Sequence, residues 1–323
     1  MTGGVVGGAA RAPRGRVAVT VALAAAALLP LPFAGCVAAA RWQDDVTLAL
    51  RDARATGREL VVFFALPGRD ASDRMQASLT DATVLAAVAE GGFVAAVADG
   101  AVRGNLYAAW IGGGEGMGIA VLDAQGRCYA ARPGPQDPPE LAAFLRLCAR
   151  SRAELAAARA RVEQPVVAPL DQHALGCLLL ELGCRRECEP LLLTAATAGV
   201  ADARHRLARL YALDGDVTAA RRWLAAAPST PAALVTEGYV RFKERRHHDA
   251  IAAFEQALAS ERLGDDRQRA LLYLAKALHE DRQDARAVSL LRALAAEGTG
   301  STFEAAALHT LSHIESPQHG HTH

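Results

Sequence analysis

The sequence predicts a mixed α/β domain followed by an all-α region of helical repeats, with a separate N-terminal segment in front of both. Three observations support this division. Over residues 41–163, short β-branched and aromatic runs alternate with segments of helical periodicity. Over residues 171–314 the pattern is helical and repeats itself. Residues 1–40 have the composition of an export signal, and residues 315–323 form a histidine-rich tail.

The N-terminal segment has the three parts of a signal peptide. Arg11, Arg14 and Arg16 precede an uncharged apolar run over residues 17–29, and prolines and small residues follow. The run is shorter than the roughly 20 apolar residues that a membrane-spanning helix needs. We therefore expect residues 1–40 to be a signal peptide and the protein to be exported to the cell envelope.

A cysteine near the end of this segment leaves two possibilities for how the exported protein is processed. Residues 33–36, Phe-Ala-Gly-Cys, resemble a bacterial lipobox, in which the cysteine is lipidated and becomes the new N-terminus. Lipidation of Cys36 would anchor the chain to a membrane. The alternative is cleavage after Ala40, which would release a soluble protein that begins at Arg41.

Charge and length limit the classes of function. The 35 basic residues balance the 35 acidic ones, so the composition gives no electrostatic support for nucleic-acid binding. The chain beyond residue 40 has the length of about two domains. No cofactor motif is evident: the glycine-rich stretch at 112–118 precedes a strand, whereas a dinucleotide fingerprint follows one.

The first half of the α/β domain begins with apolar residues at helical spacing over residues 42–56, and Gly57 ends this helix as a C-cap would. The continuous apolar run at 60–64 predicts a strand buried on both faces. Asp70 is then expected to cap one helix and Asp81 the next, because aspartate side chains accept hydrogen bonds from free amides at helix starts.

The second half of the domain supplies the rest of the sheet. The pattern predicts a strand over residues 93–98, a short helix over 106–110, and a hairpin of strands over 118–122 and 127–131. Two prolines at 138 and 139 then suit the first turn of a closing helix. The predicted fold class is a mixed central sheet flanked by helices.

Two stretches of this domain resemble the thioredoxin superfamily: the strand Val61–Phe64 with its following loop and helix, and residues 119–126 followed by Pro-Gly-Pro at 133–135. The resemblance implies a thioredoxin-like fold over about a third of the chain. That family carries a Cys-x-x-Cys motif at a helix N-terminus, where the attacking thiol has a lowered pKa. It also carries a cis-proline before the third central strand.

Both hallmarks of the family are missing here. The matching redox positions are Arg69 and Ser72, and the matching cis-proline position is Met117. No cysteine lies between residues 37 and 127, so dithiol oxidoreductase activity is not expected and the domain is predicted to be non-catalytic. Arg69 and Ser72 at a helix start could instead bind an anion; the alternative is a solvated turn with a helix cap.

Prolines in the stretch 164–170 predict a linker, and the helical region beyond it is self-similar. Equivalent small residues recur at intervals of 30 to 37 residues, close to the roughly 34-residue tetratricopeptide period. These segments resemble tetratricopeptide or Sel1-like repeats, which implies an α-solenoid whose concave face binds a protein or peptide. A capping box at Ser301–Glu304 predicts a last helix. The small residues, which would let paired helices approach closely, are Gly176, Ala208, Gly238 and Ala275.

The cysteines of the helical region suggest a disulfide. Cys177 and Cys188 lie equally far from a turn at residues 182–183, so two antiparallel helices could bring them together and leave Cys184 exposed. The alternative is that these cysteines are buried as small apolar residues.

Five histidines near the C-terminus could bind zinc, copper or nickel. His309 and His313 are one helical turn apart, and no carboxylate or cysteine partner is evident from the sequence. The alternative is a polar tail without metal. The other three histidines, His319, His321 and His323, lie in the tail.

Taken together, these features predict a non-catalytic, membrane-anchored or periplasmic interaction protein. The alternative is an atypical thiol-disulfide oxidoreductase or redox chaperone that uses the single cysteine Cys184, which Arg185 and Arg186 follow.

Overall fold

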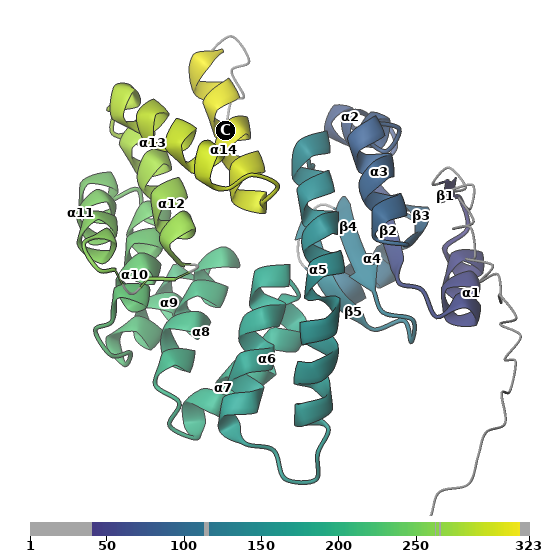
Figure 1. The fold of residues 1–323 in the computed structure, drawn as a ribbon, viewed down its shortest axis with the longest axis horizontal. Coiled ribbons are helices and arrows are strands. Elements are labelled where there is room, and N and C mark those ends of the chain that lie inside the picture. Colours follow the sequence, from purple (N-terminus) through teal and green to yellow (C-terminus); the bar gives the residue numbers. More distant parts are fainter. Residues whose placement is uncertain (1–40, 113–115, 262, 265, 317–323) are drawn as a thin grey trace, which may run out of the picture. The chain divides into compact units, whose positions relative to one another are not determined.

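A five-stranded mixed sheet forms the N-terminal half of the described chain (Figure 1). The computed structural model describes residues 41–112, 116–261, 263–264 and 266–316. The strand order is β1-β3-β2-β4-β5, with β3 parallel and β4 antiparallel to β2. The strands are β1 Trp42–Gln43, β2 Leu60–Ala65, β3 Val94–Asp99, β4 Gly118–Leu122 and β5 Cys128–Pro133.

Some of the expectations fall on residues outside these ranges. The signal peptide and Cys36 precede the described residues, and His319, His321 and His323 follow them. Lipidation and the metal-binding role of the tail therefore stay predictions. Within the described chain, no helix has the length and apolar character to cross a membrane.

Helices cover both faces of the sheet. Leu60, Val62 and Phe64 of β2 pack with α1 Val46–Thr56 and α4 Gly104–Trp110. The alternate residues of β2 point to the opposite face and belong to a second cluster. This burial on both sides explains why β2 is apolar at every position. The helices on the second face are α2 Asp70–Ser78, α3 Ala82–Glu90 and α5 Pro138–Val162.

Two expected element starts are wrong by a few residues. Trp42 does not begin the first helix: it lies in β1 and pairs with Ala95 of β3, and Asp45 is the N-cap of α1. Asp70 does not cap α2, because the N-cap position is Arg69, whose side chain makes no capping hydrogen bond. Asp81 caps α3 as expected, by accepting from the amide of Thr83 at 2.8 Å.

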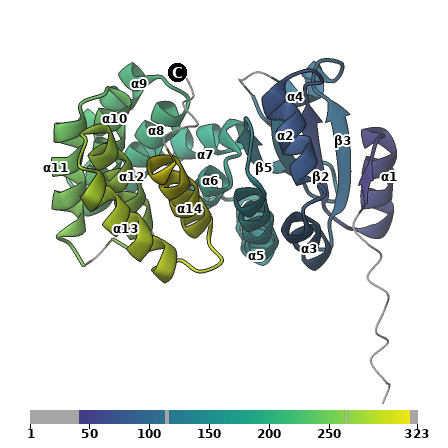
Figure 2. The same cartoon turned by 90° about the horizontal axis from the view of Figure 1, so that it is seen from above.

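The second half of the described chain is helical, and consecutive helices pack on one another. The last helix also returns to contact α5, so that it lies between α13 and α5 in Figure 2. The helices are α6 Pro169–Leu182, α7 Arg185–Thr197, α8 Asp202–Leu213, α9 Val217–Ala225, α10 Pro231–Lys243, α11 His247–Leu258, α12 Asp266–Glu280, α13 Asp284–Glu297 and α14 Thr302–Glu315.

Small residues allow these helices to approach closely, as expected. A Cβ added at Gly176 of α6 would lie 2.9 Å from the side chain of Leu192 on α7. One added at Gly238 of α10 would lie 2.7 Å from the ring of Phe254 on α11. At the start of α14, Ser301 accepts from the amide of Glu304, but the Glu304 carboxylate binds the amide of Gly300 and not that of Ser301.

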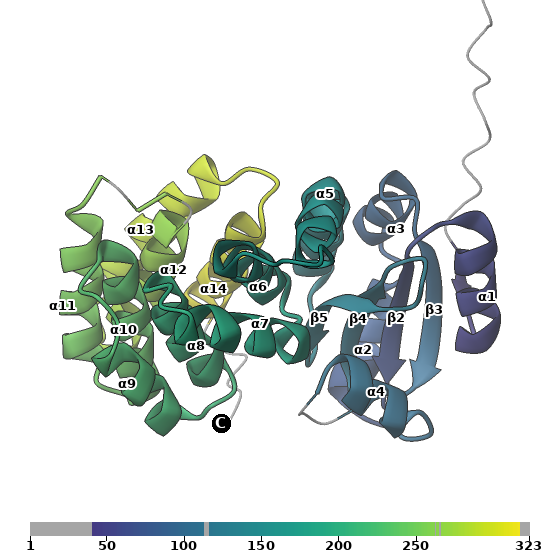
Figure 3. The same ribbon diagram turned by 90° about the horizontal axis from the view of Figure 1, so that it is seen from below.

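One hydrophobic cluster joins one face of the sheet to helices α5–α8. The predicted linker falls on the break between α5 and α6, although α6 already begins at Pro169. Beyond it, the turn between α6 and α7 lies against β5, where Gly183 forms an antiparallel bridge with Ala130 (Figure 3). Gly183 has φ +81°. A Cβ there would lie 2.3 Å from the carbonyl oxygen of Ala131, so only glycine fits this junction.

Candidate functional site

A cavity of about 880 Å³ lies where β5 and α5 meet helices α6, α8, α12 and α14. This volume is in the range of pockets that hold a small molecule or part of a peptide. Its wall contains ten charged side chains, and arginines outnumber carboxylates by six to four. The arginines are Arg132, Arg150, Arg185, Arg206, Arg209 and Arg269, and the carboxylates are Glu140, Glu154, Glu181 and Asp266.

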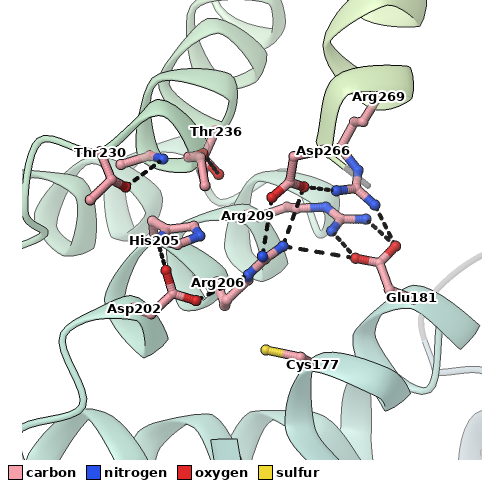
Figure 4. Close-up of polar contacts among 12 residues, drawn as sticks. Cys177, Glu181, Asp202, His205, Arg206, Arg209, Thr230, Thr236, Asp266 and Arg269 are labelled. Atoms are coloured by element: carbon pink, nitrogen blue, oxygen red, sulfur yellow. Dashed lines mark hydrogen bonds and ion pairs between the residues drawn. The ribbon is translucent and has the colours of Figure 1, made fainter. Parts of the chain in front are cut away.

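Glu181, in the last turn of α6, is the centre of this charged wall (Figure 4). The Arg209 guanidinium on α8 donates to its two carboxylate oxygens at 2.5 and 3.2 Å, and Arg269 on α12 donates to one of them. Burial by itself would raise the pKa of Glu181. The cations Arg209 and Arg269 outweigh burial and hold that pKa well below its usual range, so Glu181 is charged.

Asp266 is the second anion of the network and the first residue of α12. Arg206 donates to its two oxygens at 3.4 and 3.1 Å, and Arg269 donates to one of them as well. Arg206 also lies 3.7 Å from a carboxylate oxygen of Asp202, so three buried or half-buried guanidinium groups share three carboxylates.

Arg132, on β5, adds a further, half-buried cation to this wall. Its guanidinium donates to the carbonyl oxygens of Ala131 at 3.0 Å and Glu181 at 3.1 Å, and lies 4.5 Å from the centre of the Phe144 ring. Among the described residues no carboxylate forms an ion pair with it. Burial lowers the pKa of Arg132, and the charges of Arg185 and Arg209 add to that lowering. An anion in the cavity would relieve this repulsion.

Apolar and aromatic side chains complete the wall. Phe144 of α5 and Phe303 of α14 face the cavity with Leu272 and Tyr273 of α12. The Arg269 guanidinium lies 5.9 Å from the centre of the Phe303 ring. The cavity can therefore take a ligand that combines negative charge with apolar groups.

Two histidines adjoin the arginine network on its α8 side. Asp202 hydrogen-bonds His173 and raises its pKa to about 9. His205 is buried, and its Nδ1 lies 3.3 Å from a carboxylate oxygen of Asp202 without forming a well-aligned hydrogen bond. Burial and the charge of Arg206 lower the pKa of His205 to about 4, so it is neutral near pH 7.

Ser72 and Arg69, which the sequence suggested for anion binding, differ in burial: one side chain is buried and the other is exposed. Ser72 is fully buried, and its hydroxyl oxygen accepts from the amide of Leu66 at 2.8 Å, which closes the loop after β2. Arg69 is exposed at the N-cap of α2. Because the Ser72 hydroxyl faces the protein interior, the two side chains do not form a common anion site.

Met117 is buried just before β4, near the same end of the sheet. Its carbonyl oxygen accepts from the Tyr107 hydroxyl at 3.2 Å and from the amide of Gly134 at 2.9 Å. No cis peptide bond occurs within the described ranges. The preceding residue, Gly116, lies beside the side chain of Leu66, in the loop after β2.

The expected arrangement of the cysteines is wrong. Cys177 and Cys188 are free thiols: Cys177 Sγ lies 3.3 Å from Nε2 of His173, and Cys188 Sγ donates to the carbonyl of Arg185. Cys184 is buried and not exposed, because its turn lies on β5. There it hydrogen-bonds the carbonyl oxygen of Cys128 at 3.3 Å.

A basic stretch near the end of α10 and the start of α11, residues 239–246, is a second place where cations gather. Two of its arginines are paired locally, Arg241 with Glu237 and Arg246 with Asp249. Sequence reasoning missed the arginine cavity, whose charged residues come from six separate elements. The one available signal was that Arg206 and Arg209 alternate with apolar residues that the helix buries.

Comparison with known proteins gives no match: no protein-family model fits the sequence, and no curated protein is significantly similar to it. The arginine cavity is the site with the strongest physical basis for a function.

Proposed function

We propose that this chain is a non-catalytic protein of the cell envelope that binds an acidic segment of a partner protein in the arginine cavity. The observation that carries the proposal is Arg132, a half-buried guanidinium on the cavity wall that has no carboxylate ion partner among the described residues. Burying a cation without a counter-ion is unfavourable, and a carboxylate ligand would offset that penalty with charge-assisted hydrogen bonds.

The composition of the cavity wall favours a peptide over a small inorganic anion. Phosphate or sulfate would use the guanidinium groups but leave Phe144 and Phe303 without contacts. A segment that alternates aspartate or glutamate with apolar side chains would use both. Arginine and aromatic residues are also enriched at the centres of protein interfaces.

The architecture supports the wider proposal of tetratricopeptide-like repeats behind a thioredoxin-like domain. Residues of α6, α8 and α12, each the first helix of a pair, line the cavity, as expected if first helices form the inner surface of a solenoid. For the thioredoxin-like domain, support comes from the mixed sheet, from the loop and helix after β2, and from Met117 before β4. Export and a lipid anchor at Cys36 rest on the sequence alone.

One observation favours the alternative of thiol chemistry. Cys184 occupies the N-cap position of α7, and a hydrogen bond with the Cys128 thiol lowers its pKa. A catalytic thiol must reach its substrate, however, and Cys184 is only 4% exposed. We therefore rank this function second. An insulin-reduction assay separates the two: we expect the wild type and Cys184→Ser to be equally inactive, and activity that only the variant loses would favour the thiol enzyme.

The binding proposal is tested with two rhodamine-labelled peptides of equal length, an oligoglutamate and an oligoglutamine. Fluorescence anisotropy should show saturable binding of the first and none of the second. Raising the salt concentration should weaken the interaction, because exposed parts of the charged wall are screened. Equal binding of the two peptides would contradict an acidic ligand.

A further inference from the structure

The N-terminus of α5 and the helix α14 together present a cluster of metal-binding side chains. One potential ligand atom from each of Asp137, Glu140 and His309 lies within 4.8 Å of the other two. Asp137 and Glu140 belong to the first turn of α5, and His309 belongs to α14, about 170 residues later in the chain. The carboxylate partners that the sequence did not reveal for His309 are therefore supplied by a distant element.

The contacts of His309 fix both of its ring nitrogens. Nδ1 lies 2.6 Å from a carboxylate oxygen of Asp137, and Nε2 lies 3.0 Å from Nε2 of His313, one turn further along α14. A histidine that binds a metal through one nitrogen usually holds its other nitrogen in a hydrogen bond, which fixes the ring. His313 is in position to do this for His309.

The side chain of Asp137 also does not cap its helix. Asp137 occupies the N-cap position of α5, but its side chain makes no capping hydrogen bond. Pro138 and Pro139 lack amide hydrogens, so the first turn of α5 has few backbone donors for the Asp137 carboxylate. The carboxylate instead faces His309 on the other helix.

We propose that Asp137, Glu140 and His309 form a binding site for a divalent transition metal of the zinc type, with His313 as the hydrogen-bond partner of His309. Zinc accepts nitrogen and carboxylate-oxygen ligands in combination, with bonds of about 2.0–2.2 Å. Ligand atoms around it lie roughly 3–4 Å apart. Rotation of these surface side chains closes the remaining difference, and water completes the coordination.

Such a site would connect α14 to α5 beside the arginine cavity. Glu140 itself lines the cavity, as do Phe303 and Ala306 of α14. Metal binding would therefore hold two walls of the cavity together. It does not depend on the ligand of the cavity, so either proposal can fail without the other.

The test is isothermal titration calorimetry of the full chain with zinc alone. We expect Asp137→Asn/Glu140→Gln and His309→Asn each to weaken the affinity at least tenfold. A variant with alanine at the three tail histidines should keep the high-affinity site. The matched control is Asp284→Asn, which removes the carboxylate of another exposed pair, His279 and Asp284, whose atoms are also 2.6 Å apart; it should have no effect.

Two results would overturn the metal site. One is unchanged zinc affinity in Asp137→Asn/Glu140→Gln together with its loss in the tail variant, which would place the metal on the tail. The other is the absence of binding to the wild type. Circular dichroism of each variant checks the fold, and the absorption bands of cobalt substituted for zinc provide an independent readout of mixed nitrogen and oxygen coordination.

Discussion

Arg132 on β5 donates a hydrogen bond to the backbone carbonyl of Glu181, at the end of α6, at 3.1 Å. This contact joins the sheet to the helical region at the wall of the arginine cavity. The side chain of Glu181 meanwhile binds Arg209 and Arg269 from two further helices. Glu181 therefore contributes to the contact between the sheet and the helical region through its backbone, and to the charged wall of the cavity through its side chain.

The glycine of the α6–α7 turn should be essential for this junction. We predict that Gly183→Ala lowers the free energy of unfolding by about 3 kcal/mol or more, because the added Cβ would overlap the carbonyl of Ala131. Gly199→Ala is the matched control: it has φ +91° but open space around it, and should cost only about 1–2 kcal/mol. Urea denaturation measures both, and equal losses would contradict the close contact.

The buried hydroxyl of Ser72 should have a structural role. We predict that Ser72→Ala destabilises the protein by about 1–3 kcal/mol, since the amide of Leu66 loses its acceptor inside the protein. Ser78→Ala in the same helix should change stability by less than about 0.5 kcal/mol, because Ser78 only donates to the carbonyl of Arg74 in its own helix. A harmless Ser72→Ala would mean that water replaces the hydroxyl.

The two histidines beside the network should give stability two separate pH dependences. The pKa of His205 is lowered from 6.5 to about 4. The stability that the neutral His205 contributes to the folded state is therefore present above pH 6.5 and lost as pH falls toward 4. The pKa of His173 is raised from 6.5 to about 9, so its contribution is present below pH 6.5 and lost as pH rises toward 9. Asp202, Arg206 and Asp266 set the field around His205.

Urea denaturation at pH 5, 7 and 9 tests this assignment. We expect His205→Leu to lose less stability than the wild type between pH 7 and pH 5, and to behave like it between pH 7 and pH 9. His173→Gln should show the reverse. If both variants follow the wild type at every pH, other groups control the acid and alkaline limits.

The free thiols are also open to a direct check. Mass spectrometry of the non-reduced protein should find Cys177 and Cys188 alkylated and unbridged after denaturation in the presence of the alkylating reagent. In the folded protein, Cys148 and Cys188 should react slowly, because burial raises the pKa of each thiol. A Cys177–Cys188 peptide pair would instead restore the arrangement suggested by the sequence.

Local signals located most of the elements. The β-branched and aromatic run of β2 and the hairpin of β4 and β5 have strong local patterns, and Asp81 is a clear helix cap. Strand β1 was missed because it has only two residues, and its pairing with β3 depends on contacts about 50 residues away. The helical pattern from Val46 onward masked it.

The candidate site could not be found in the same way. Glu181, Arg209 and Arg269 come from three helices, and a charged residue on a helix is by default expected on a solvated face. The site exists only because α12 and α8 bring their arginines to the end of α6. The carboxylates beside His309 were missed for the same reason, since α5 and α14 meet only in the folded chain.

The most direct test of the arginine cavity as a binding site for acidic segments is the affinity of Arg132→Met for the rhodamine-labelled oligoglutamate. Loss of a charge-assisted hydrogen bond of about 1.5–3 kcal/mol predicts a tenfold or greater rise in Kd. Arg286→Met is the matched control, because Arg286 is exposed on α13 and pairs with Glu255 away from the cavity. If the first variant does not fold, Arg150→Gln at the exposed edge of the cavity takes its place. Weakened binding in the cavity variant and unchanged binding in Arg286→Met would support the cavity, whereas equal Kd values for the cavity variant and the wild type would contradict it.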